Sequence, residues 1–374
     1  MTGLRVTINT LSVTMGNEGI RTMLVGLVPA LVRAGGDHRF RLLCSRANVG
    51  LFAGAGDGVE RLVLSTARRR TLVRILQDQI VVPWVVARNT DVLFTPSSVG
   101  SIAATVPQVV AFQAGLALPS IRRLGAADLS LPHRVYFGPV MRLSHQRATA
   151  ITPVSDYLAR QLIADTGIPS AKVEAILLGI DGVACMPGQN GNYALVVGTL
   201  WPYKNLAKFV DAFAIARPRL PDGFRLVVAG RDPDGHQMSI IRSRIDAGGL
   251  SDLVELVGHI EGAPLDQLYR NATVVVIPSL LEGFGLPALE AMAWGVPVIA
   301  SGRTALPEVV GGAAVLVDPD DPVEMANRLV EVANDPDLCD RLVAAGRQRA
   351  AELSWDRAAE SYITLFERVA AARR

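Results

Sequence analysis

Two glutamates that flank a glycine-rich turn are the residues of this chain with the clearest chemical potential. Glu282 and Glu290 are separated by seven residues in the stretch PSLLEGFGLPALEAMAWGVPVIAS, between strands predicted at Thr273–Ile277 and Pro297–Ala300. The turn must therefore open a helix, and Pro287 suits its first position. Unpaired amides and the positive end of the helix dipole form an anion site there. With a carboxylate on either side, the site suits a ligand with phosphates in the middle and hydroxyls at both ends, as in a nucleotide-sugar.

The whole stretch resembles the signature of retaining glycosyltransferases of the GT-B fold, specifically glycosyltransferase family 4. In that family the paired glutamates bind the sugar nucleotide. The resemblance implies that Glu282 faces the donor hexose and Glu290 the ribose of the nucleotide. It also implies that the backbone of the turn lies against the sugar and phosphates, at Gly283, Phe284, Gly285 and Leu286. The alternative is a strand–turn–helix whose glutamates only cap and solvate the helix start.

A second candidate is the segment VVGTLWPYKN, which contains Gly198 and Lys204. A cation at the carboxyl edge of a doubly wound sheet lies where phosphates bind, and Lys204 can neutralise a diphosphate as a point charge. The family resembled has a glycine here and then a Lys-Asn or Lys-Gly pair, which Lys204 and Asn205 match. An arginine that many relatives place after the glycine is replaced by Thr199, and Arg231 is the candidate substitute. A solvated loop lysine is the alternative for Lys204.

The first half of the chain matches the family pattern at fewer places. Gly16 to Gly19 (GNEG) correspond to the glycine loop between the first strand and first helix. In relatives that loop lines the cleft near the donor phosphates and the acceptor; a turn without ligand is the rival. Where family members commonly carry a histidine, this chain has Gln113, which can hydrogen-bond a sugar hydroxyl but cannot act as a base at neutral pH. His133 and His145 lie where the acceptor would bind, although a lone histidine more often has a structural role.

Two Asp-Pro-Asp triplets, at 232–234 and 318–320, raise the question of a metal. In metal-dependent glycosyltransferases of the other main fold, such a triplet holds a divalent ion against the diphosphate. Here each triplet follows a strand and contains proline, and 318–321 is typical of a turn that leads to a helix N-cap. Because a lysine and helix amides are available for the phosphates, we expect no metal, and no cofactor besides the donor substrate.

The bulk composition fits a two-domain protein of 374 residues. No run approaches the 18 or more uninterrupted apolar residues of a membrane span. Three widely spaced cysteines indicate neither a disulfide framework nor a zinc site, so we expect a reduced, cytoplasmic protein.

Charge is distributed unevenly along the chain. Up to Asp181 the net charge is +8, and the remainder carries −6. A basic half could attract phosphates, anionic lipid headgroups or an acidic acceptor, although surface charge also drifts without function. The arginines at 68–70 and 74, among apolar neighbours, resemble an amphipathic helix that could rest on the inner face of a membrane or simply face water. We expect no nucleic-acid partner.

Strand and helix signals alternate throughout, which favours an α/β protein with parallel sheets. The Gly- and Asn-rich stretch 179–192 is the predicted linker. It separates an acceptor domain (1–182, with the helix 355–374 packing back on it) from a donor domain (191–354). The resemblance implies two Rossmann-like domains that face each other across a cleft. The main strands predicted before the linker are Leu4–Asn9, Phe40–Cys44, Arg61–Leu64, Val92–Phe94, Gln108–Phe112, Ala148–Pro153 and Val173–Leu177.

The resemblance implies hexosyl transfer with retention of configuration, with Glu282, Lys204 and Gln113 as the expected catalytic residues. No carboxylate pair resembles that of a double-displacement enzyme, so front-face attack is expected. We expect GDP-mannose or another nucleotide-diphosphate hexose as donor, and a glycan or lipid-linked acceptor in polysaccharide or glycolipid synthesis. Two alternatives stay open. One is a nucleotide-sugar isomerase or phosphorylase on the same fold; the other is a non-catalytic sugar-nucleotide-binding subunit, prompted by Thr199 and Gln113.

Overall fold

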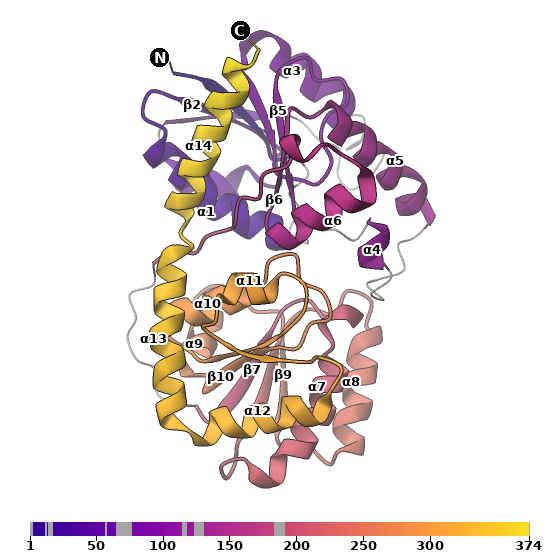
Figure 1. The fold of residues 1–374 in the computed structure, drawn as a ribbon, viewed down its shortest axis with the longest axis vertical. Helices are drawn as coiled ribbons and strands as arrows, with labels where there is room; N and C mark the ends of the chain where they lie inside the picture. The colour runs from indigo at the N-terminus through magenta and orange to yellow at the C-terminus, as the bar shows by residue number, and fades with distance from the viewer. Residues whose placement is uncertain are drawn as a thin grey trace. The chain divides into compact units, whose positions relative to one another are not determined.

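The computed structural model describes residues 3–11, 13, 18–56, 58–64, 77–113, 118–122, 131–182 and 191–373 (Figure 1). Gly16, the arginine cluster at 68–74 and linker residues 183–190 lie outside the described residues. The chain divides into two compact units. The first combines Met1–Ser120 and Leu129–Asp181 with the segment from Leu353 onward, and the second consists mainly of Gly182–Glu352.

In the described part of the first unit, six parallel strands form one sheet in the order β3-β2-β1-β4-β5-β6. This is the strand order of a Rossmann fold, in which the chain reverses direction across the sheet after its third strand. Buried apolar runs explain the strands, since parallel strands are covered on both faces. The strands are β1 (Arg5–Asn9), β2 (Arg39–Cys44), β3 (Val59–Val63), β4 (Val92–Thr95), β5 (Gln108–Phe112) and β6 (Ala150–Pro153).

Three of the longer described helices of this unit lie between its strands in sequence, one follows the last strand, and one comes from the end of the chain. They are α1 (Glu18–Ala34), α3 (Val82–Asn89), α5 (Leu131–Arg147), α6 (Asp156–Thr166) and α14 (Trp355–Ala371). Short turns are η1 (Val49–Ala55), η2 (Gln77–Val81), α4 (Pro119–Arg122) and η4 (Ser170–Lys172).

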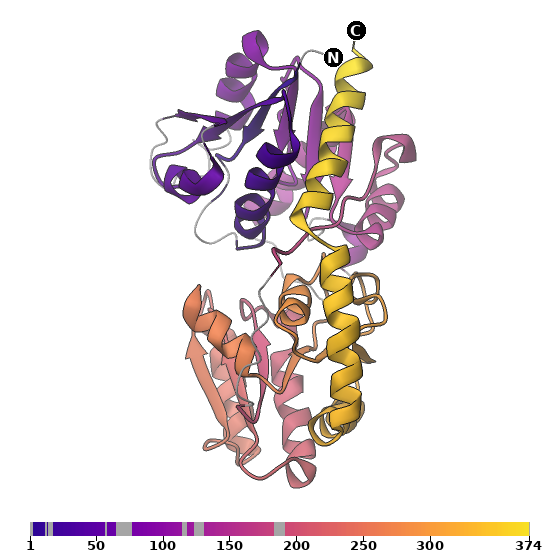
Figure 2. The ribbon, with the colours of Figure 1, turned by 90° about the vertical axis from the view of Figure 1, so that its left-hand side faces the viewer.

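The helix from the end of the chain, α14, packs alongside α1 of the first unit (Figures 1 and 2). Ser354 begins the helix as an N-cap, because its side chain accepts a hydrogen bond from the backbone N of Arg357. Its buried stripe places Tyr362 and Phe366 against Phe94 of β4, with ring centroids 4.8 and 5.6 Å from that of Phe94. The expected return of the C-terminal helix to the first unit is confirmed.

Residues 191–352 repeat the same architecture, with six parallel strands in the order β12-β11-β10-β7-β8-β9. The strands are β7 (Tyr193–Val197), β8 (Arg225–Ala229), β9 (Val254–Gly258), β10 (Val274–Ile277), β11 (Val298–Ser301) and β12 (Val315–Val317). The helices are α7 (Leu206–Ala216), α8 (His236–Ala247), α9 (Ala263–Asn271), α10 (Leu286–Ala293), α11 (Leu306–Val310), α12 (Pro322–Asn334) and α13 (Pro336–Glu352), with short turns η5 (Pro202–Lys204) and η6 (Arg217–Arg219). The expected α/β class with two Rossmann-like domains is confirmed.

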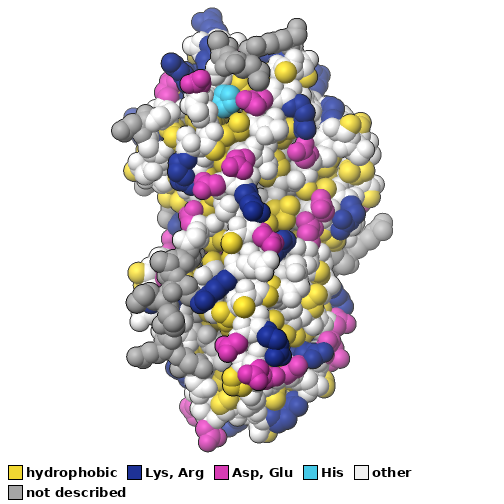
Figure 3. All heavy atoms as spheres, turned by 60° about the vertical axis from the view of Figure 1, so that its left-hand side comes forward, with side chains coloured by type: hydrophobic (Ala, Val, Ile, Leu, Met, Phe, Trp, Pro, Cys, Tyr) yellow, Lys and Arg dark blue, Asp and Glu magenta, His cyan; other side chains and the backbone are white. Residues whose placement is uncertain are grey.

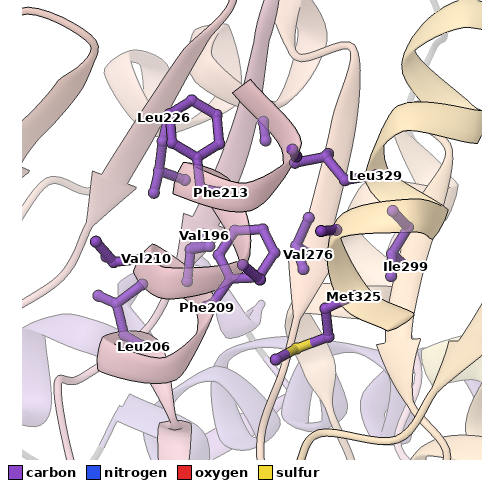
Figure 4. Close-up of a cluster of buried hydrophobic side chains, with 14 of the residues drawn as sticks. Val196, Leu206, Phe209, Val210, Phe213, Leu226, Val276, Ile299, Met325 and Leu329 are labelled. Carbon is purple, nitrogen blue, oxygen red and sulfur yellow. The ribbon is translucent and has the colours of Figure 1, made fainter. Parts of the chain in front are cut away.

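The core of the second unit lies between its sheet and three helices (Figure 4). Alternate residues of β7 and β10, such as Val196 and Val276, pack against Phe209 and Phe213 of α7 and Met325 of α12. Because residues two apart in a strand share one face, α7, α8 and α12 cover that face of the sheet. On another part of the unit, α10 packs against α13.

One expectation about an element was wrong, and one helix was not predicted. Val173–Leu177 is not a regular strand: Val173 forms an isolated bridge to Ile151 of β6, and two backbone hydrogen bonds hold the following residues beside that strand. The helix α13 was missed, because its buried positions include the small residues Gly346 and Ala350 and its sequence shows no strong apolar stripe. A glycine at 346 lets α13 approach α10 closely, since a Cβ there would lie 3.1 Å from Met292 Cγ.

On the face drawn in Figure 3, Lys and Arg side chains are interspersed with Asp and Glu. Several basic residues of the first unit are paired, such as Arg5 with Asp91 and Arg41 with Glu60. Of the helices within the described ranges, none combines the length and apolar character needed to cross a bilayer.

Candidate active site

The carboxyl ends of β7 and β10 define the position of the candidate site. These strands are neighbours in the sheet, and the chain continues from them to opposite edges. Ligands of doubly wound sheets bind at this switch point, just beyond the strand ends. The loop after β7 carries Lys204, and the loop after β10 carries Glu282. The fold therefore brings together two residues that are far apart in sequence.

Lys204 and Glu282 form a largely buried ion pair. Lys204 Nζ lies 2.7 Å from Glu282 Oε1, and Glu282 is only 8% exposed. The same oxygen accepts a hydrogen bond from Ser279 Oγ at 2.8 Å. Within the described residues no hydrogen bond reaches the other oxygen, Oε2. One carboxylate oxygen is thus held by the protein, and the second is left to accept from a ligand hydroxyl.

Asn205 fixes the loop that carries Lys204. Its backbone is left-handed, with φ of 59°. Its side-chain Nδ2 donates to the carbonyl oxygens of Pro278 at 3.1 Å and Pro319 at 2.7 Å, which ties together the loops after β7, β10 and β12. Because the Nδ2 hydrogens are directed to these carbonyls, Asn205 positions the loop in this structure. The prediction that Asn205 binds the donor therefore requires contact through its Oδ1 atom.

The glycine-rich turn presents backbone amides at the start of α10. Gly285 has φ of 102°, a conformation that favours glycine. Within the described chain, the amides of Phe284, Gly285 and Leu286 donate to no protein acceptor. The Phe284 side chain is buried in the core, so the residue offers only its backbone to a ligand. These amides and the helix dipole make the turn suitable for an anion, as the sequence predicts.

Glu290 lies one helical turn further along α10. Its Oε2 accepts a hydrogen bond from the Tyr269 hydroxyl on α9, at 2.6 Å. Burial raises the pKa of Glu290, and the bond from Tyr269 opposes that rise. Like Glu282, this glutamate has one oxygen held by a protein donor.

Other predicted donor-site residues lie along the same sheet edge. Gly198 has φ of 141°, and a Cβ there would lie 3.7 Å from Lys204 Nζ. Gly230, at the end of β8, lies so close to the backbone of Gly198 that a Cβ added to Gly230 would be 1.9 Å from Gly198 O. The carbonyl of Arg231 accepts from Leu200 N, so Arg231 lies beside the β7 loop. Whether it replaces the arginine missing at Thr199 stays a prediction.

The first unit brings two of its predicted residues together. A Cβ at Gly19 would lie 3.9 Å from Gln113 Oε1, and Gln113 Nε2 donates to Pro96 O at 3.2 Å. Gln113 therefore lies at the carboxyl edge of this sheet, next to the start of α1. His145 is buried and its Nε2 contacts Ser98 O at 2.8 Å, while burial lowers the pKa of His145 to about 4. It is a neutral structural histidine, and His133 has its side chain outside the described residues.

The Asp-Pro-Asp triplets serve as turns and helix caps. Asp318 and Asp320 both pair with Arg303, and Asp321 caps α12. In the first triplet, Asp232 Oδ2 accepts from Met238 N. Across the residues that the structure describes, no group of three or more His, Cys, Asp or Glu side chains is arranged to hold a metal ion.

Sequence reasoning did not find the residues that orient the two glutamates. Ser279 and Thr304 hold Glu282, the latter by accepting from its backbone N at 3.0 Å, and Tyr269 holds Glu290. Ser279 lies within the motif but received no role. Tyr269 and Thr304 carry no local signal, since their function depends on which loops the sheet brings together.

Comparisons with known proteins agree with this geometry. Residues 187–349 match the family model of glycosyl transferases group 1. O-antigen chain mannosyltransferase B of Escherichia coli is 27% identical over 245 residues, which are 62% of this chain and 64% of the relative. The MMP alpha-(1->4)-mannosyltransferase of Mycolicibacterium hassiacum is 32% identical over 238 residues, 62% of this chain and 56% of the relative. The chain thus spans about six tenths of the length of these two relatives.

Among solved structures, Anabaena Alr3699/HepE in complex with UDP and glucose superposes with a TM-score of 0.74. It is 19% identical, and the match covers 97% of this chain and 99% of that one. This likeness bears on the fold, which is GT-B. Residues 187–349, most of the second unit, are thus similar to the group 1 glycosyltransferases.

Proposed function

We propose that this protein is a retaining hexosyltransferase. It transfers a hexose, with mannose preferred, from a nucleotide-diphosphate sugar to a glycan or lipid-linked acceptor. The observation that carries the proposal is the Lys204–Glu282 pair at the switch point of the second sheet, 2.7 Å apart and next to a turn with available amides. That arrangement offers positive charge to a diphosphate and a carboxylate to a sugar hydroxyl within one small region.

Each residue of the site has a role in this reaction. Glu290 accepts hydrogen bonds from the ribose, Lys204 and the turn at 283–286 hold the diphosphate, and Glu282 accepts from a hexose hydroxyl. The bond between the hexose C1 and the β-phosphate oxygen breaks while the acceptor oxygen bonds to C1 on the same face. The acceptor proton passes to a phosphate oxygen of the leaving nucleotide. The protein orients the reactants and stabilises the leaving diphosphate, and Gln113 hydrogen-bonds a sugar hydroxyl.

The choice of donor follows from the relatives. Two of them are mannosyltransferases by name, which favours GDP-mannose. The Anabaena structure holds UDP and glucose, which makes UDP-glucose the main competitor. For the acceptor, the excess of basic residues before Asp181 suits an anionic, lipid-linked substrate. A cytoplasmic protein that contacts the inner face of the membrane peripherally would meet such an acceptor.

The first test removes the charged groups of the site. We expect Lys204→Ala and Glu290→Ala each to lower kcat/KM for hexosyl transfer by about 100-fold or more, since loss of one preorganised stabilising group has effects of that size. Nucleotide release coupled to acceptor glycosylation measures the rate, and thermal unfolding confirms the fold. Lys208→Ala is the matched control, because Lys208 pairs with Asp320 on the surface, where an ion pair contributes little.

A double variant separates catalysis from stability. Lys204→Ala leaves the Glu282 carboxylate buried without its cation, which can cost about 3–5 kcal/mol of folding free energy. Lys204→Met combined with Glu282→Gln removes both charges and avoids that penalty. Full activity in the folded double variant together with full activity in Glu290→Ala would overturn the site assignment. Tight donor binding with neither transfer nor hydrolysis over many acceptors would instead select a non-catalytic binding subunit, and isomerisation or a need for free phosphate would select the other enzyme classes.

A further inference from the structure

Tyr269 is a buried residue that donates a hydrogen bond to Glu290, one of the residues of the candidate donor site. It lies on α9, is 1% exposed, and its hydroxyl is 2.6 Å from Glu290 Oε2. We propose that Tyr269 is a positioning residue for nucleotide recognition: its hydroxyl holds the Glu290 carboxylate in the orientation that presents Oε1 to the two ribose hydroxyls. This inference rests on the proposed function, and it names the group that makes the ribose contact selective.

The geometry leaves a defined role for each oxygen of Glu290. The terminal torsion of a glutamate is broad, so a carboxylate without a partner samples many orientations. Tyr269 occupies Oε2, and within the described residues no hydrogen bond reaches Oε1. A single donor on one oxygen fixes the plane of the carboxylate. Oε1 is then preorganised as an acceptor, and less conformational freedom is lost when the ribose binds.

The hydrogen bond from Tyr269 also favours an ionised Glu290 that accepts hydrogen bonds from a ligand. Burial raises the pKa of Glu290, the hydrogen bond from Tyr269 lowers it, and Asp266 on α9 raises it. On α13, Arg347 lies against Gly295, just beyond the end of α10. Burial and the Glu290 charge raise the pKa of Tyr269 well above its ordinary value, so the phenol keeps its proton and remains a donor. The hydroxyl therefore helps to keep Glu290 ionised, which strengthens its acceptance of ribose hydroxyls.

The simpler explanation is that Tyr269 only anchors α9 to the rest of the unit. A second tyrosine already has that role, since Tyr193 on β7 donates to the carbonyl of Leu268 on α9 at 2.7 Å. Tyr193 is also buried and contacts the residue next to Tyr269, but no hydrogen bond links it to Glu290. The two tyrosines provide a matched pair: one variant removes an anchor of α9, and the other removes the contact to Glu290.

The test compares Tyr269→Phe and Tyr193→Phe in the full-length protein. Calorimetry measures the affinity for GDP and UDP, and for their 2′,3′-dideoxy forms, from mildly acidic to neutral pH. Tyr269→Phe should weaken binding of the ribonucleotide by about 10-fold, the effect of losing a hydrogen bond to a charged group. It should leave the dideoxy nucleotide nearly unchanged, so that discrimination between the two falls. Tyr193→Phe should retain the discrimination of the unaltered protein.

The pH dependence of nucleotide affinity supplies a second readout, which would not change if Tyr269 only anchored α9. Without the hydroxyl, the pKa of Glu290 rises, so the loss of ribonucleotide affinity on acidification should begin at a higher pH in Tyr269→Phe. Unchanged discrimination and an unchanged pH profile, or equal effects in both variants, would overturn the inference while the proposed function stands. If the unaltered protein binds neither GDP nor UDP, the proposed function itself fails, and the role of Tyr269 fails with it.

Discussion

Because Gly285 has no Cβ, the backbone of the turn that forms the candidate anion site can lie close to Leu306. A Cβ there would lie 2.5 Å from Leu306 Cδ2, and Leu306 is fully buried. Gly285→Ala therefore combines a left-handed backbone with a clash in the core, and we expect a loss of about 2–4 kcal/mol in the free energy of unfolding. The amides of the turn would move with the backbone, so nucleotide affinity should fall as well. Urea unfolding and calorimetry measure the two effects.

Gly235→Ala is the control for Gly285→Ala. Gly235 also has a positive φ, 77°, but a Cβ there meets nothing within 4 Å. Its variant should lose only about 1–2 kcal/mol from backbone strain and bind nucleotide as before. Equal losses in both variants, with unchanged nucleotide binding, would mean that Leu306 moves aside and that the turn does not depend on this glycine.

The sequence alone assigns a role to some residues of the candidate site and not to others. Lys204 and Glu282 could be identified because each lies in a loop that follows a strand, and Glu290 because it belongs to the same motif, on the helix that the turn opens. Ser279, Thr304 and Tyr269 could be assigned their contacts only from the structure, since the contacts depend on side-chain orientation and, for Thr304 and Tyr269, join separate elements 22 and 21 residues apart. The roles of Gln113 and Arg231 stay predictions, because their ligand contacts depend on a bound substrate.

At the scale of elements, a large aromatic side chain near the start of α14 packs against α1, in addition to the contacts of Tyr362 and Phe366 with Phe94. Trp355 is 3% exposed, and a Cβ at Gly26 of α1 would lie 2.2 Å from its indole Nε1. Trp355→Ala should destabilise the first unit by about 3–5 kcal/mol through loss of apolar burial and the cavity left behind. Trp84→Ala is the control, since Trp84 is 71% exposed and surface changes usually stay within about 0.5 kcal/mol. A similar unfolding midpoint for both variants would show that α14 contributes little.

The predictability of elements follows from burial. Strands β4 and β5 were found because both faces are buried, which leaves short apolar runs, and β1 from its alternation of apolar and polar residues. The segment at Val173 lies along β6, but one bridge and two backbone hydrogen bonds, from Glu174 N to Ile151 O and from Ile176 N to Pro153 O, do not make it a regular strand. The helix α13 packs through small residues, which give little hydrophobic periodicity in the sequence.

At the scale of the whole molecule, the two units should differ in their ability to fold alone. A fragment of residues 182–352 contains a complete sheet and its core, so it should unfold cooperatively and bind the donor nucleotide without transferring sugar. A fragment of residues 1–181 lacks α14 and exposes Phe94 and the buried face of α1, so it should aggregate or remain partly unfolded. Circular dichroism and calorimetry test both. A well-folded 1–181, or an unfolded 182–352, would contradict this division of stability.

The point where the chain leaves the first unit and the point where it returns are hydrogen-bonded neighbours. Ile180 N donates to Leu353 O at 2.9 Å, and a Cβ at Gly179 would lie 2.2 Å from Ser354 C. In the order of the chain, residues 182–352 interrupt the first unit, and both ends of this segment attach at one place. Recombination between relatives could therefore replace the second unit as one segment and leave the connections within the first unit unchanged. Under the proposed function, the choice of donor sugar and the choice of acceptor would then change independently.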